Sequence, residues 1–170
     1  IVHESPVGTS DHTSCEFNSH YTLVNTNVNI LFVIIIISRE FIISAFRLVC
    51  ALEDGDNEFV TEQYGDIAAL ATVGDIVPLL CENRTIVKNG LSLIENTNRL
   101  GLASLIEQSG AGNSVMNSNA VAYRLVPRIN AAGRFSNAEL AVKLLMSEDE
   151  DEANSLAVEL CEINEKRRAE

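Results

Sequence analysis

The chain lacks several features that would assign it quickly to a class of protein. Its 170 residues include no tryptophan and only three prolines, and the four cysteines lie more than thirty residues apart. That spacing excludes a CxxC metal or redox pair and favours a reduced, cytoplasmic setting. Positive charge is also scarce, because the formal net charge is −12. This excludes a protein that grips nucleic acid with its whole surface, so any such binding must be local.

A membrane span is also missing from the sequence pattern. The apolar run Ile30–Ile37 is eight residues long and ends at Ser38, Arg39 and Glu40, whereas a spanning helix needs about 20 apolar residues. The N-terminal residues lack the basic and apolar regions of a signal peptide. We therefore predict no contact with a membrane.

What is present is the composition and the patterning of a folded domain. Apolar residues make up 46% of the chain and charged residues 21%, which is ordinary for a globular protein of about one domain. The Val- and Ile-rich stretch 21–37 predicts a buried strand of a parallel sheet. Length favours a helix over residues 41–52, and apolar stripes predict helices over 61–72 and 83–94. Further helices are predicted over 101–108 and 118–132, with a kink or break at Pro127, which has no N–H to donate.

Two capping-box patterns mark the starts of the last helices. Ser136 with Glu139, and Ser147 with Glu150, have the spacing at which a hydroxyl and a carboxylate satisfy the free N–H groups of a first turn. The second helix has acids in its first turn and bases at its far end, which complements the helix dipole. One strand followed by helices predicts the later part of an α/β domain, with its partner strands upstream of residue 1.

Two acidic positions are candidates for chemistry. Asp11 and His12 are an adjacent acid and imidazole. The pair suits a metal ligand or a proton relay, or it is simply a polar pair in a loop. Asp75 follows an apolar helix inside an apolar stretch, and a carboxylate buried there needs a partner because burying an unpaired charge is costly. A metal ion and a helix N-terminus are both suitable partners.

A locally basic stretch is the third candidate. Residues 108–138 contain no Asp or Glu but include Arg124, Arg128 and Arg134. Arg124 and Arg128 are four positions apart and share a helix face, and arginine is suited to bidentate contact with phosphate. The alternative is that these arginines pair with acids elsewhere, such as those at 148–152.

Taken together, these segments resemble the RecJ exonucleases of the DHH phosphoesterase superfamily. Asp66–Leu79, which reads DIAALATVGDIVPL, resembles the family's fourth motif, DLVALGTIADVVPL. Arg124–Arg134, which reads RLVPRINAAGR, is close to the family's RLGPRINAAGR. Residues 82–91 resemble the segment after the fourth motif, and Asp11-His12-Thr13 stands where the family has its DHH triplet. The resemblance is good over residues 44–170 and weaker upstream.

The resemblance implies a fold and a function. The fold is the C-terminal part of a DHH-type parallel-sheet α/β domain, mostly helical, with a partial domain over 1–146 and the start of a connector helix over 147–170. The function is metal-dependent 5′ to 3′ hydrolysis of single-stranded DNA in repair and recombination, with two Mn or Mg ions. By position His12 and Asp75 are metal ligands, Asp11 supports His12, and Arg124, Arg128 and Arg134 contact DNA phosphates.

The sequence also departs from the family pattern. Thr13 replaces the second histidine of the triplet, the isoleucine run replaces a Gly-rich turn, and no DxD motif precedes residue 11. We therefore expect this segment to be catalytically inactive by itself. Two other functions stay open: a DHH phosphodiesterase acting on oligoribonucleotides or cyclic dinucleotides, and a decayed, non-catalytic interaction module.

Overall fold

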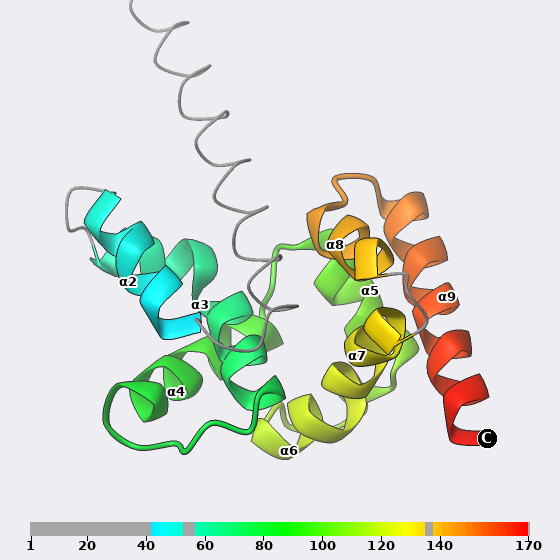
Figure 1. Ribbon diagram of the computed structural model, residues 1–170. Coiled ribbons are helices and arrows are strands. Elements are labelled where there is room, and N and C mark those ends of the chain that lie inside the picture. Colours follow the sequence, from blue (N-terminus) through cyan, green and yellow to red (C-terminus); the bar gives the residue numbers. More distant parts are fainter. Residues whose placement is uncertain (1–41, 53–56, 135–137, 170) are drawn as a thin grey trace, which may run out of the picture.

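Every regular element in the described part of the chain is a helix. The computed structural model describes residues 42–52, 57–134 and 138–169, and no strand occurs within these ranges (Figure 1). The predicted strand over 21–37 lies outside them. The mostly helical character expected for residues 41–170 is therefore confirmed, and the parallel sheet is not seen in the described residues.

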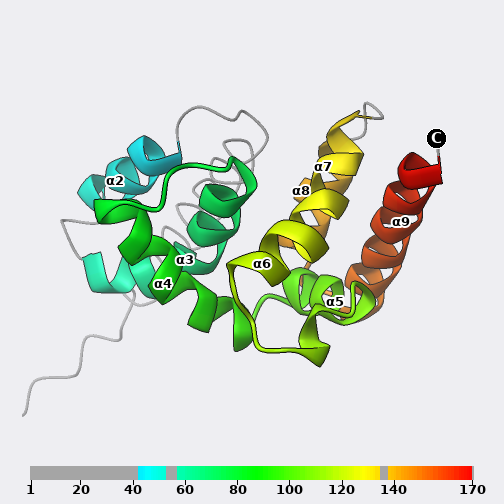
Figure 2. The ribbon, with the colours of Figure 1, turned by 90° about the horizontal axis from the view of Figure 1, so that it is seen from below.

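Three helices form a first group. They are α2 (Ile42–Leu52), α3 (Asn57–Gly74) and α4 (Cys81–Glu95), which lie beside one another in both views (Figures 1 and 2). Apolar residues at helical spacing on α2 and α3 place Val49, Val60 and Leu70 in the core. Gly90 of α4 allows α3 to approach closely, because a Cβ at this position would lie 2.3 Å from the Gly65 carbonyl oxygen.

The remaining helices form a second group. They are α5 (Leu100–Gln108), the short α6 (Ser118–Ala120), α7 (Val126–Arg134), α8 (Ala138–Met146) and α9 (Glu150–Ala169). Helix α9 packs against α5, α7 and α8. Gly101 of α5 lies directly against the backbone of Leu144 in α8. The two groups share one hydrophobic core, and they meet where α3 contacts the chain around α7.

The break predicted at Pro127 is confirmed and takes the form of a π-helical turn. This turn, η2, spans Val121–Leu125 and leads directly into α7. The Val126 N–H donates to the carbonyl of Val121, five residues back. Pro127 has no N–H, and its ring would clash with the carbonyl of residue 123 in a regular α-helix. The wider turn relieves this conflict, and π turns of this kind often occur at functional sites.

Helix starts are close to the predicted positions, with one correction. Helix α8 begins at Ala138, beside the predicted capping pattern, whose Ser136 lies outside the described residues. Helix α9 is capped by Asp149 instead of Ser147, because Asp149 Oδ1 accepts the Glu152 N–H at 2.8 Å. Ser147 Oγ bonds instead to the Glu152 carboxylate at 3.1 Å. A carboxylate is the stronger cap, since it also neutralises the positive end of the helix dipole.

No helix within the described ranges is long and apolar enough to cross a membrane.

Candidate functional site

Asp75 occupies the C-cap position of α3. After the helix ends at Gly74, the Ile76 N–H donates to the Val73 carbonyl at 3.2 Å, and the Val77 N–H donates to the Thr72 carbonyl at 3.4 Å. These two bonds define a Schellman motif, in which the residue after the C-cap takes a left-handed conformation. The motif holds the backbone of Asp75 in one place. Its side chain is half-buried, with Oδ2 enclosed by protein.

The left-handed position of this motif is filled by an unfavourable residue. Ile76 has φ 56° and its side chain is 89% exposed. Glycine is the usual residue there, and a β-branched side chain is a clear outlier at positive φ. The strain costs on the order of 1–2 kcal/mol, and such strain clusters at functional sites. The exposed isoleucine contributes little packing to offset it.

We therefore expect Ile76→Asn to stabilise the chain. Asparagine tolerates the left-handed region and avoids the extra backbone entropy of glycine. The free energy of unfolding should rise by about 1 kcal/mol, measured by urea denaturation followed by circular dichroism. Val158→Asn, at an exposed apolar position inside α9, is the control and should not stabilise. Equal or lower stability of Ile76→Asn would show that the isoleucine makes a compensating contact.

The end of α3 packs directly against the start of α7. A Cβ placed on Gly74 would lie 3.4 Å from Cγ2 and 3.5 Å from Cγ1 of Val126. Val126 is the first residue of α7, so Gly74, the last residue of α3, lies beside the N-terminal end of that helix. Side chains three, four and seven positions apart share a helix face. Asn130 and Gly133 therefore lie on the same face of α7 as Val126.

The arginines of the acid-free stretch have other contacts. Arg124 is exposed and donates through Nη1 to the Gly110 carbonyl. Arg128 is half-buried; it donates through Nη1 to the Arg124 carbonyl and through Nε to Cys161 Sγ on α9 at 3.2 Å. Val126 and Arg128 are two positions apart, which places them on different sides of α7. The structure thus brings Arg124 and Arg128 together but directs Arg128 toward α9, away from the Gly74 contact.

The other sequence-predicted site residues cannot be placed in the same way. Asp11 and His12 lie outside the described residues, and so does the side chain of Arg134. Within the described part, no three His, Cys, Asp or Glu side chains gather closely enough to hold a metal ion. The described residues therefore supply one candidate carboxylate ligand, Asp75, and not a complete metal centre.

Sequence reasoning missed an ion pair that fixes α3 in place. Asp66 is buried in α3, and its Oδ2 accepts from Arg99 Nε at 2.9 Å. Arg99 also donates through Nη2 to the Gln63 carbonyl, and its guanidinium lies 6.0 Å from the centre of the Tyr64 ring. The signal was available in the sequence, because Asp66 is a lone acid in the same apolar stretch as Asp75. Breaking such a buried pair is strongly destabilising.

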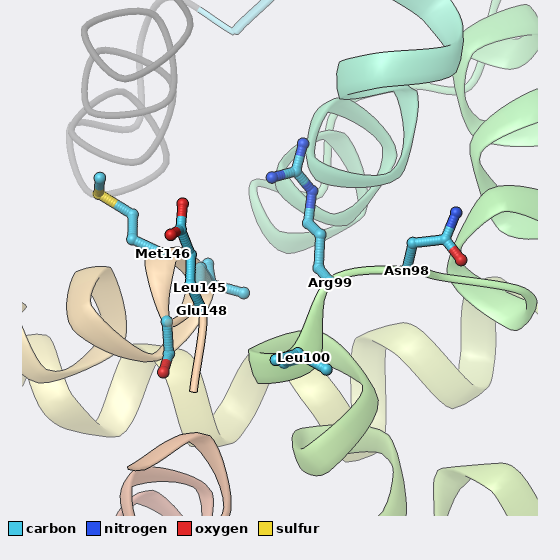
Figure 3. Close-up of a pocket in the computed structure, with 7 residues that line it drawn as sticks. Asn98, Arg99, Leu100, Leu145, Met146 and Glu148 are labelled. Carbon is cyan, nitrogen blue, oxygen red and sulfur yellow. The ribbon is translucent and has the colours of Figure 1, made fainter. Parts of the chain in front are cut away.

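Arg99 also borders a cavity of about 330 Å³ between the first turn of α5 and the α8–α9 connection (Figure 3). Its lining residues are Asn98, Arg99, Leu100, Leu145, Met146, Ser147 and Glu148. Arg99 reaches from the chain before α5 toward α3, and Asn98 points away from the side where Leu145, Met146 and Glu148 lie. The one cation in this lining is already paired with Asp66, so we propose no ligand for this cavity.

Two side chains of α2 have shifted pKa values. Burial raises the pKa of the Cys50 thiol above its usual value. A hydrogen bond and charge attraction from Glu82 raise the pKa of Arg47.

Sequence comparisons agree with the motifs identified above. The chain is 48% identical over 103 residues to the single-stranded-DNA-specific exonuclease RecJ of Bacillus subtilis, a match covering 61% of this chain and 13% of that protein. It is 39% identical over 124 residues to the RecJ of Thermus thermophilus, covering 73% of this chain and 18% of the relative. No protein-family model matches the chain.

Solved structures of RecJ also match the chain. A crystal structure of RecJ from Thermus thermophilus in complex with Mn²⁺ matches 64% of this chain and 16% of its own, with 40% identity and a TM-score of 0.60. A crystal structure of exonuclease RecJ bound to manganese matches 74% of this chain and 32% of its own, with 38% identity and a TM-score of 0.66.

In both sequence and fold, the chain is therefore similar to exonucleases that bind metal ions. More narrowly, it is a RecJ-like segment, and the resemblance drawn from the motifs at 66–79 and 124–134 is confirmed. The chain spans 13% and 18% of the length of the two curated relatives described above.

Proposed function

We propose that the protein containing this segment is a metal-dependent 5′ to 3′ exonuclease that hydrolyses single-stranded DNA in repair and recombination. The observation that carries the proposal is the similarity to manganese-bound RecJ structures, at 38–40% identity and TM-scores of 0.60 and 0.66. The relatives that match at 48% and 39% identity are single-stranded-DNA-specific exonucleases by name. At such identities, this segment and the matching segments of the relatives have one fold.

Asp75 and His12 are the proposed metal ligands, with Asp11 supporting His12. Carboxylate oxygen is a ligand that Mn and Mg prefer, and the Schellman motif fixes the Asp75 backbone before any ion binds. When bound, two such ions would activate water and stabilise the leaving oxygen of an in-line displacement. Asp75 and His12 are too few ligands for two ions, so the segment alone should be inactive.

Arg124, Arg128 and Arg134 are the proposed phosphate contacts. The stretch 108–138 around them contains no acid, which keeps the local surface positive although the chain carries a net charge of −12. Arg128 is held by Cys161 Sγ and by the Arg124 carbonyl. A long side chain that is already held in place loses less conformational entropy when it binds DNA.

The larger architecture is also part of the proposal. It comprises a parallel-sheet α/β domain of the DHH type whose partial extent is 1–146, followed by a connector helix from 147. Helix α9, at Glu150–Ala169, supports the proposal of a connector helix in this region. We also propose a reduced, cytoplasmic setting, which the spacing of the cysteines favours.

The test uses the complete protein and a DNA single strand labelled at its 5′ end. With Mn²⁺ we expect labelled mononucleotide to be released from the single strand, little release from a blunt duplex, and none in EDTA. Matched reactions with oligoribonucleotides and cyclic dinucleotides separate this function from that of other DHH phosphodiesterases. Preference for either of those substrates, or no hydrolysis at all, would refute the exonuclease function.

A further inference from the structure

One face of α7 carries Val126, Asn130 and Gly133, and it meets the last residue of α3 at Val126. Val126 contacts Gly74, the residue before Asp75, and so fixes which side of α7 faces the C-terminal end of α3. Four and seven positions further along the helix, on the same side, are Asn130 and Gly133, and both are exposed. We call Asn130 and Gly133 the α7 strip.

Gly133 is an unexpected residue in this strip. Glycine inside a helix costs up to about 1 kcal/mol relative to alanine. The other helical glycines at close crossings have a packing reason, because a Cβ on Gly90 or Gly101 would overlap the backbone of a neighbouring helix. At Gly133 no described atom lies within 4 Å of where a Cβ would be. Packing among the described residues therefore does not require a glycine here.

Asn130 gives the strip a specific chemistry. Its amide offers two donors and one acceptor without a charge, and asparagine is among the side chains that contact DNA phosphate and sugar. No acid occurs from 108 to 138, so the strip itself carries no negative charge that would repel a phosphate. An amide donor, an open backbone and an acid-free surface suit a sugar–phosphate chain better than an apolar protein partner.

We infer that the α7 strip is a track for the sugar–phosphate backbone of the single strand, with Asn130 donating to a phosphate oxygen and Gly133 leaving room for close approach. This inference rests on the proposed nuclease function. It assigns the strand to the Asp75 side of α7. Arg128 lies on another side of the helix, so its phosphate contact is separate from the strip.

Three variants of the complete protein test the strip by binding. The probe is a fluorescein-labelled oligothymidylate in EDTA, so that affinity is measured without hydrolysis. Loss of a hydrogen bond to a charged group costs at least about tenfold, so Asn130→Ala should weaken binding about tenfold. Asn130→Asp should weaken it further, because a carboxylate repels phosphate. Gly133→Leu should weaken it about tenfold or more by blocking the track, without lowering the melting temperature.

Matched controls use exposed positions on other helices. Asn89→Ala in α4 repeats the change made in Asn130→Ala, and Ser155→Leu in α9 places a leucine at another exposed helical position; both should leave affinity unchanged. Wild-type affinity of all three strip variants would overturn the inference while leaving the nuclease function intact. A lowered melting temperature for Gly133→Leu would also overturn it, because protein would then cover the strip. A wild-type protein that neither binds nor cleaves single strands would instead refute the proposed function.

Discussion

Replacing Asp75 by asparagine in the complete protein should reduce manganese-dependent release of nucleotides from a 5′-labelled single strand by about 100-fold or more. Loss of a group that only orients a metal ligand already costs about 10–100-fold, and this change removes a proposed ligand charge. Asparagine has nearly the same shape, and the Schellman bonds that hold Asp75 come from backbone atoms. The fold should therefore survive, and only metal affinity and turnover should fall.

The control for this prediction is Asp151→Asn. Asp151 is an exposed acid in the first turn of α9, so its loss changes the net charge by the same amount with no effect on turnover. A manganese titration gives the second measurement, because a lost ligand should raise the metal concentration needed for half-maximal activity. Unchanged activity and an unchanged manganese requirement in Asp75→Asn would remove Asp75 from the metal site.

Gly101→Ala should give the largest loss of stability, about 3 kcal/mol in the free energy of unfolding. A Cβ at this position would lie 1.7 Å from the carbonyl oxygen of Leu144 and 2.5 Å from its carbonyl carbon. Neither atom belongs to a flexible side chain, so α5 and α8 would have to move apart. Leu102, Leu105 and Leu144, all fully buried around this crossing, would lose contacts together.

Gly112→Ala is the matched comparison. Its added Cβ would lie 3.4 Å from the Ile106 side chain, which can shift slightly, so the free energy should change by less than about 1 kcal/mol. Urea denaturation of the two variants, followed by circular dichroism, measures the difference. Coincident unfolding midpoints would mean that the α5–α8 crossing is looser than the backbone contact indicates.

The helices could be predicted from the sequence because their signals are local. Apolar spacing placed the helices ending near 52, 74 and 95, and Pro127 marked the break that the structure fills with a π turn. The cap of α9 was misplaced by two residues, since Ser147 and Asp149 both have capping side chains. The Asp66–Arg99 pair was missed because its partners are 33 positions apart, and no periodic pattern encodes such a contact.

The candidate site could be predicted only in part. Asp75 stood out because a lone acid among apolar residues needs a structural reason, and the structure gives it a fixed, half-buried place at the end of α3. The direction of Arg128 could not be predicted, because it depends on how α7 is rotated against α3 and α9. That rotation is fixed by the Val126–Gly74 contact and by Cys161, which are far apart in the sequence.

Helix α3 is held near its middle by Arg99. Asp66 is anchored by that arginine, and Asp75 lies nine positions further along, about 13 Å away at 1.5 Å per residue. A tilt of about 5° at the anchored end would move the carboxylate end by about 1 Å, a displacement that can cost an enzyme about 100-fold in rate. The Asp66–Arg99 pair is therefore one of the contacts on which the position of Asp75 depends.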